Sequence, residues 1–217
     1  MSSPWQSGSR EQALEALPEI DSLAKEVLTT EKYEETNKVV SMLLKPLKKR
    51  KWAHAKLIME IGYRPTRPLF YLMPLLQGLP RNTRDCIRYL GDYLDLLTKE
   101  LAFEYLGGNS RQSSLGKNAF RLLKSNLSPE IQDIAKTLIR YNSFLYTPGK
   151  HDFTLPPGRK HRFTAREVVL TTYVTAVMAK RIKAVSKKAR TAVEKDNLYI
   201  IGGRWGSKRR VRFAGDE

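Results

Sequence analysis

The sequence has few of the residues that build several common kinds of site. Its single cysteine, Cys86, excludes an internal disulfide framework and a four-cysteine zinc site. Its three histidines, at positions 54, 151 and 161, leave little material for a histidine-based metal centre, so we expect neither a metal nor a cofactor. Glycine-rich dinucleotide and P-loop motifs, Gly-x-Ser-x-Gly and His-Glu-x-x-His are also missing.

Long apolar runs are missing as well. The longest, residues 68–76, contains prolines and is far shorter than the roughly 20 residues that a bilayer span requires. The first twelve residues lack a cationic start followed by an apolar run, so we expect no secretory signal. With a single cysteine, the expected compartment is the reducing cytoplasm, without membrane attachment.

Acidic residues are scarce relative to basic ones. The chain carries 39 Lys and Arg against 22 Asp and Glu, a formal charge of +17, and 41% of its 217 residues are hydrophobic, enough for a folded core. Residues 150–217 hold 17 of the basic and six of the acidic residues. Because clustered cations attract phosphates, nucleic acid is the leading partner, with RNA favoured over DNA. An anionic membrane surface, or simple solubility, is the alternative reading of this charge.

Helical periodicity dominates the chain and predicts an all-α bundle. We expect helices over residues 11–28, 31–62 with a break at Pro46, 82–106, 117–125, 128–144 and 164–194. Residues 63–80, rich in proline, are expected to form an irregular apolar connector, and 147–162 a loop. Asn82, Ser128-Pro129 and the pair Thr164 and Glu167 supply helix-start signals. This division gives N-terminal helices and connector in 1–80, a bundle core in 81–196 and a basic aromatic tail in 197–217.

The last predicted helix has two unlike sides. On a helical wheel, apolar residues from Leu170 to Val193 fall on one side. Cations fall on the other, at Lys180, Lys183, Lys187 and Arg190. A straight helix displays these cations over about 15 Å, which lets them meet several phosphates. The simpler alternative is the solvated face of an ordinary helix.

The tail repeats the same combination of charge and aromatic rings. The residues that we expect to contact nucleic acid there are Arg204, Trp205, Lys208, Arg209, Arg210 and Arg212. Aromatic faces stack on unpaired bases while guanidinium groups hold phosphates. A small hairpin whose aromatic residues pack on the bundle is an equally good interpretation.

One segment has the residue types for chemistry on RNA. Arg140 and Asn142 come near the end of a helix, and His151 and His161 follow in a basic loop. Imidazole titrates near neutrality and serves as a general acid or base, while cations stabilise a transferring phosphate. The cations expected to contact the nucleic acid here are Lys150, Arg159, Lys160 and Arg162. The alternative is a loop that caps the bundle, with its histidines bonded to backbone.

This segment resembles the HEPN superfamily of all-α, often dimeric proteins of host defence and toxin systems. An Arg-x-Asn near the end of a bundle helix, a later histidine and a following long helix carry the resemblance, at Arg140, Asn142 and His151 within residues 82–194. The resemblance implies metal-independent ribonuclease activity at a dimer cleft.

The residues leave three functions open. The first is an RNA-binding protein with this ribonuclease activity, and the second is a non-catalytic nucleic-acid-binding subunit of a larger defence or ribonucleoprotein complex. The third is a protein–protein adaptor that docks through the apolar residues 69–76. The sequence patterns allow a homodimer or a larger complex.

Overall fold

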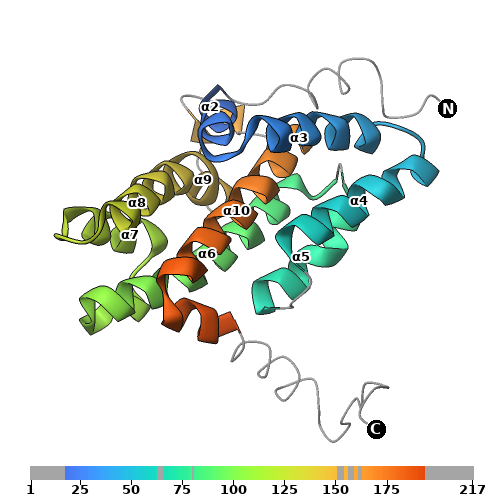
Figure 1. The fold of residues 1–217 in the computed structure, drawn as a ribbon. Helices are drawn as coiled ribbons and strands as arrows, with labels where there is room; N and C mark the ends of the chain where they lie inside the picture. The colour runs from blue at the N-terminus through green and yellow to red at the C-terminus, as the bar shows by residue number, and fades with distance from the viewer. Residues whose placement is uncertain are drawn as a thin grey trace, which may run out of the picture.

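The computed structural model describes residues 18–62, 66–79, 81–150, 154–155, 159–160 and 163–193, apart from the side chains of 47–49, 154–155 and 159–160. The described part is an all-α bundle with one small antiparallel ladder (Figure 1). Its elements are α2 (Pro18–Val27), α3 (Thr30–Leu43), α4 (Leu47–Ile61), α5 (Arg67–Gln77), α6 (Thr83–Leu106), η1 (Gly108–Gln112), α7 (Leu115–Lys124), α8 (Pro129–Tyr141), η2 (Asn142–Tyr146), α9 (Thr147–Lys150), β1 (Thr154–Leu155), β2 (Arg159–Lys160) and α10 (Ala165–Val185). A further helical segment covers 187–193.

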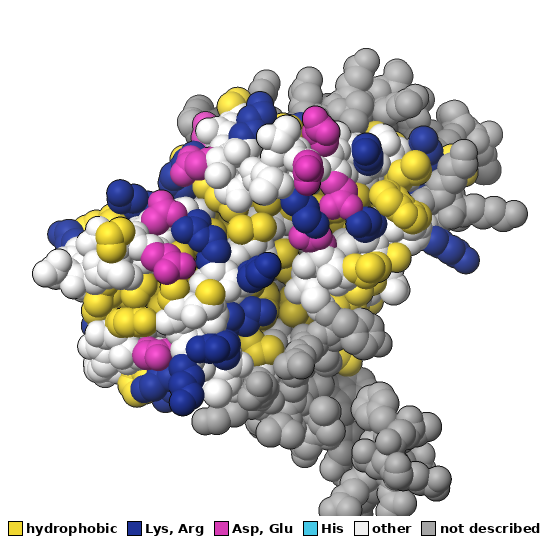
Figure 2. Space-filling model, viewed as in Figure 1, with side chains coloured by type: hydrophobic (Ala, Val, Ile, Leu, Met, Phe, Trp, Pro, Cys, Tyr) yellow, Lys and Arg dark blue, Asp and Glu magenta, His cyan; other side chains and the backbone are white. Residues whose placement is uncertain are grey.

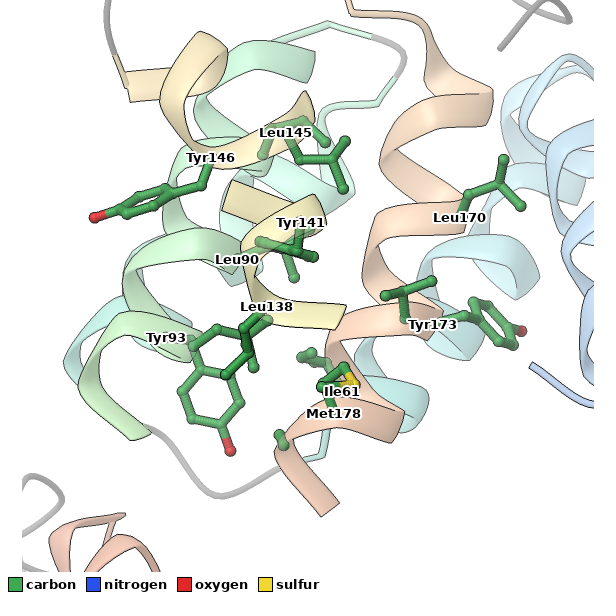
Figure 3. Close-up of a cluster of buried hydrophobic side chains, with 14 of the residues drawn as sticks. Ile61, Leu90, Tyr93, Leu138, Tyr141, Leu145, Tyr146, Leu170, Tyr173 and Met178 are labelled. Atoms are coloured by element: carbon green, nitrogen blue, oxygen red, sulfur yellow. The ribbon is translucent and has the colours of Figure 1, made fainter. Parts of the chain in front are cut away.

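Helix α10 runs through the middle of the bundle and packs against α2, α3, α4, α6 and α8 (Figure 1). Its residues 167–175 are all buried, and Thr171 and Thr172 satisfy their hydroxyls by donating to carbonyls one turn back. Figure 3 shows side chains of α6, α8 and η2 gathered beside those of α10. The predicted two-sided helix is therefore confirmed only beyond Thr175, where Met178 and Ile182 are buried and Lys180 is exposed.

Several local signals act as predicted. The helix is interrupted at Pro46, between α3 and α4, and α8 begins at Pro129 after Ser128. Thr164 and Glu167 form a reciprocal capping box at the start of α10. Asn82 is different: it adopts a left-handed conformation (φ 59°), and its side chain makes no capping hydrogen bond. Its side chain therefore does not stabilise the start of α6 in the predicted way.

The predicted irregular connector is wrong, because residues 67–77 form helix α5. Pro68 lies in the first turn, where a helix does not use the missing amide proton, and Pro74 costs one hydrogen bond inside the helix. Three leucines at helical spacing offset that cost by burial: Leu69, Leu72 and Leu76. These leucines belong to the same hydrophobic core as α10. Residues 18–79 and 81–193 thus share one core across the expected boundary at 80.

The loop predicted over 147–162 is wrong for its first four residues. A π-helical turn, η2, follows α8, and α9 continues to Lys150. This segment packs closely on α6 because two glycines, which have no side chain, leave room for the contact. A Cβ on Gly91 would overlap the ring of Tyr146, and a Cβ on Gly149 would lie 2.8 Å from Ile87 Cγ2.

We therefore expect Gly91→Ala to destabilise the protein by about 1–3 kcal/mol, because the buried ring of Tyr146 must move. Chemical denaturation measures this change. Gly78→Ala is the matched control, since a Cβ there meets no atom closer than 3.4 Å. Equal stability of the two variants would contradict the close approach of η2 to α6.

Candidate nucleic-acid interface

The basic helix predicted over 164–194 is interrupted at Ser186. This residue has an extended backbone (φ −124°, ψ 117°), which ends α10 at Val185. Its Oγ accepts a hydrogen bond from Ala189 N (3.0 Å) and donates one to Glu104 Oε2 (2.6 Å). Ser186 thereby caps the helical segment 187–193. The prediction of one straight row of cations is therefore wrong. The cations lie on two helical segments, the end of α10 and residues 187–193, and we call their meeting point at Ser186 the joint.

The end of α6 holds this joint in place. Glu104 Oε2 also accepts from Lys188 N (2.9 Å), and Tyr105 donates its hydroxyl to Val185 O (2.7 Å). Burial raises the pKa of Glu104, but hydrogen bonds from Ser186 and nearby amides outweigh it, so its pKa lies below the ordinary 4.5. A negative charge here suits the start of a helix.

The aromatic ring of Phe103 lies next to the joint, and two cations, Arg111 and Lys188, approach it. Arg111 of η1 approaches the ring of Phe103 to 3.9 Å from the centroid, and Lys188 Nζ approaches it to 4.1 Å. Such contacts are attractive because the ring face is electron-rich. They bring a cation of η1 beside those that follow α10.

We call Lys180, Lys183, Lys187, Lys188 and Arg190 the basic arm. Four of its members are exposed and Lys183 is half-buried. Among the described residues, no carboxylate forms an ion pair with Lys180, Lys187 or Arg190. Figure 2 shows Lys and Arg side chains gathered over this half of α10 and the segment after it. Within the described part of the chain, the charges of Lys180, Lys187 and Arg190 are therefore available to an external anion.

Neighbouring cations are different, because they are used within the fold. Arg181 pairs with Asp133 of α8 at 2.5 Å, and Arg166 pairs with Asp21 of α2 at 3.1 Å. These arginines fasten α10 to the helices around it. Lys180, Lys187 and Arg190 differ from these arginines because no carboxylate in the described ranges pairs with them.

The predicted catalytic residues are only partly described. Arg140 forms an ion pair with Glu26 of α2, whereas the Asn142 amide lies against Gly116 of α7, its Nδ2 2.8 Å from where a Cβ would be. The two side chains thus turn towards different helices, and Asn142 is half-buried rather than central to the buried face. His151 and His161 lie outside the described residues. The catalytic grouping stays a prediction.

The cations predicted around these histidines are similarly divided. Lys150 is exposed, and its Nζ donates to Tyr146 Oη (3.0 Å), which in turn donates to Asp92 Oδ1 (2.7 Å). Arg159 and Lys160 lie in β2, paired with Leu155 and Thr154, without described side chains. The remaining predicted contacts lie outside the described residues: Arg162, Arg204, Trp205, Lys208, Arg209, Arg210 and Arg212.

Sequence reasoning missed Phe103, Glu104 and Arg111. Phe103 and Glu104, at the end of α6, contact residues about 80 positions later, and Arg111 of η1 contacts the ring of Phe103. An acid and an aromatic residue at the end of an amphipathic helix carry no local signal of this role. Only the packing of α6 on α10 brings them together.

In comparisons with known proteins, no family model, curated protein or solved structure matches the chain. In the part of the chain that the structure describes, no helix is long and apolar enough to cross a membrane. Within the same ranges, no group of three or more His, Cys, Asp or Glu side chains is placed to hold a metal ion.

Replacing Glu104 is expected to release the arm. Glu104→Ala leaves Ser186 Oγ and Lys188 N without their acceptor, which weakens the local structure by about 1–3 kcal/mol. Hydrogen exchange at the amides of Lys188 and Ala189 should accelerate accordingly, while exchange in the centre of α10 stays slow. Unchanged exchange at these amides would contradict the joint.

The same contact predicts a pH dependence. Because the folded-state pKa of Glu104 is lowered, its stabilising contribution is present above about pH 4.5 and is lost as the pH falls through the folded-state pKa. Glu104→Gln keeps an acceptor but not the charge. Its stability deficit, measured by denaturation, should shrink as the pH falls below 4.5, and a constant deficit would contradict the pKa shift.

Proposed function

We propose that this protein binds nucleic acid through phosphate contacts made by the basic arm. The observation that supports the proposal is that no carboxylate of the described residues pairs with the exposed cations Lys180, Lys187 and Arg190. Like charges at these spacings repel one another, and a bound polyanion relieves that repulsion. The Glu104–Ser186 joint holds the cations in place, which reduces the ordering that binding requires.

The spacing of the arm suits a phosphate backbone. Within each helical segment, a rise of about 1.5 Å per residue separates cations three residues apart, Lys180 and Lys183 or Lys187 and Arg190, by about 4.5 Å along the axis. A duplex carries one charge per roughly 1.7 Å of its axis, so each cation of the arm finds a phosphate within reach. Lysines predominate, and lysine acts as a point charge without the bidentate geometry that reads guanine. We therefore expect weak sequence preference and strong salt dependence, with RNA as the favoured polymer.

Reversing charge on the arm should weaken binding regardless of sequence. For Lys187→Glu/Arg190→Glu we expect affinity to fall roughly tenfold or more at low salt, and the slope of log affinity against log salt to decrease by about 2. Fluorescence anisotropy with RNA and DNA oligonucleotides of several sequences measures both quantities.

Lys38→Glu/Lys51→Glu is the control for net charge. Both lysines are exposed, on α3 and α4, and these helices lie away from the segment after α10 (Figure 1). Comparable losses in the two double variants would show that overall charge, not the arm, determines affinity. No binding at low salt would contradict the proposed function itself.

Ribonuclease activity is the finer form of this proposal, and it rests on the HEPN resemblance of Arg140, Asn142 and His151. We expect the purified chain to cleave labelled RNA in the presence of EDTA, and His151→Ala to abolish cleavage while leaving binding intact. His54→Ala is the control, because His54 lies on α4. Absence of cleavage by folded protein would remove the enzymatic part and leave a binding subunit.

The adaptor hypothesis receives less support. Three of the four leucines in residues 69–76, Leu69, Leu72 and Leu76, are at most 1% exposed, and Leu75 is half-buried. The large hydrophobic side chains that α5 exposes are Phe70 and Tyr71.

A further inference from the structure

Helix α5 buries its leucines but leaves two large aromatic side chains on the surface. Phe70 is 49% exposed and Tyr71 is 40% exposed. Single exposed aromatic residues are ordinary, but these two belong to a continuous group. Tyr89, half-buried on α6, completes it, and we call Phe70, Tyr71 and Tyr89 the aromatic face.

The rings of the aromatic face are already in contact with one another. Tyr71 and Tyr89 lie with centroids 5.7 Å apart at an interplanar angle of 24°, and Phe70 meets Tyr71 edge-on at 5.6 Å. The guanidinium of Arg88 lies 4.6 Å from the centroid of Tyr89. A row of flat groups therefore crosses from α6 to α5, and its mutual contacts restrain the side chains before any ligand arrives.

The surroundings of this row are basic. Arg67 begins α5 one turn before Phe70 and Tyr71, while Arg81, Arg84 and Arg88 follow one another at the start of α6. Among the described acids near this row, Asp85 lies 3.4 Å from Arg88, and Asp92 accepts from Tyr146. Exposed aromatic rings bordered by arginines complement a ligand that has both negative charge and flat rings. They complement an aliphatic partner helix poorly.

The aromatic face also has a defined neighbour. Arg84 Nε donates to Gly149 O (3.1 Å), and Gly149 sits against Ile87, so α9 lies along the same part of α6 as Arg88. The exposed Lys150 ends α9 there. A ligand bound to the aromatic face therefore lies near Lys150, after which the chain continues into residues 151–162.

We propose that the aromatic face is a stacking platform for the unpaired bases of a single-stranded nucleic acid. This inference rests on the proposed function and narrows it to strands with accessible bases. The basic arm supplies affinity for any polyanion, whereas the platform supplies preference for single strands over duplexes.

The test uses the full chain and three fluorescent probes of equal length: a single strand, the corresponding duplex and an abasic single strand. The platform predicts that the intact single strand binds more tightly than the abasic one. Tyr71→Ala should reduce affinity for the intact strand about 5- to 100-fold and leave affinity for the abasic strand unchanged. Tyr71→Phe should retain affinity, because it keeps the ring.

Phe120→Ala is the matched control, since Phe120 on α7 is also 50% exposed and also lies under a cation, Lys124 at 4.4 Å. It should leave all three affinities unchanged. Failure of every probe to bind overturns the proposed function together with the platform. Equal binding of intact and abasic strands, with no effect of Tyr71→Ala, overturns the platform alone and leaves the arm as a general polyanion site.

A second measurement covers the case in which Tyr71→Ala alters folding. Irradiation of the wild-type chain with a strand containing 5-iodouracil should crosslink bases to the peptide of Tyr71 or Tyr89. Crosslinks confined to Trp205 or other residues of the predicted tail would overturn the platform. So would a face covered by a second copy of the chain, seen as a dimer that Tyr71→Ala dissociates without any change in strand binding.

Discussion

The burial of α10 is the constraint on which the rest of the structure depends. Residues 167–175 are surrounded by α2, α3, α4, α6 and α8, so no charged surface can form along that half of the helix. Its one acid there, Glu167, is used in the capping box. Cations can appear only where the helix emerges from the bundle, and Lys180 and Lys183 mark that point. The same packing that builds the core thus confines the exposed cations of α10 to its C-terminal half.

The joint at Ser186 changes how that charge is presented. A continuous helix would carry the later cations straight out into solvent. Instead, Glu104 accepts hydrogen bonds from Ser186 and Lys188, and Phe103 lies between Lys188 and Arg111. The segment after α10 is therefore held against the end of α6. Holding like charges together costs energy, and under the proposed function a bound polyanion offsets this cost.

Local signals determined how well the sequence predicted the fold. The Thr164–Glu167 capping box, the break at Pro46 and the start of α8 depend on neighbouring residues, and all were predicted. Helix α5 was missed because its prolines suggest a loop, whereas burial of Leu69, Leu72 and Leu76 decides the outcome. The break at Ser186 was missed because apolar spacing continues to Ala189 and Val193, and the partner that stabilises the break is 82 residues away.

The candidate site shows the same division. Exposure of Lys180, Lys187 and Arg190 was predictable from helical periodicity, but their lack of carboxylate partners required the packed structure. The aromatic face depends on α5 and α6 lying side by side, so the sequence of neither helix alone predicts it. The divergent directions of Arg140 and Asn142 follow from the ion pair with Glu26 and from the space at Gly116, which no motif encodes.

Lysine footprinting tests the central claim most directly. The full chain would be acetylated with and without a saturating RNA oligonucleotide, and the modified lysines identified by mass spectrometry. If the basic arm binds the phosphate backbone, Lys180 and Lys187 become protected while the exposed Lys38 and Lys51 remain reactive. Equal reactivity of Lys180 and Lys187 in bound and free protein, under conditions where RNA binding is saturated, would contradict the account.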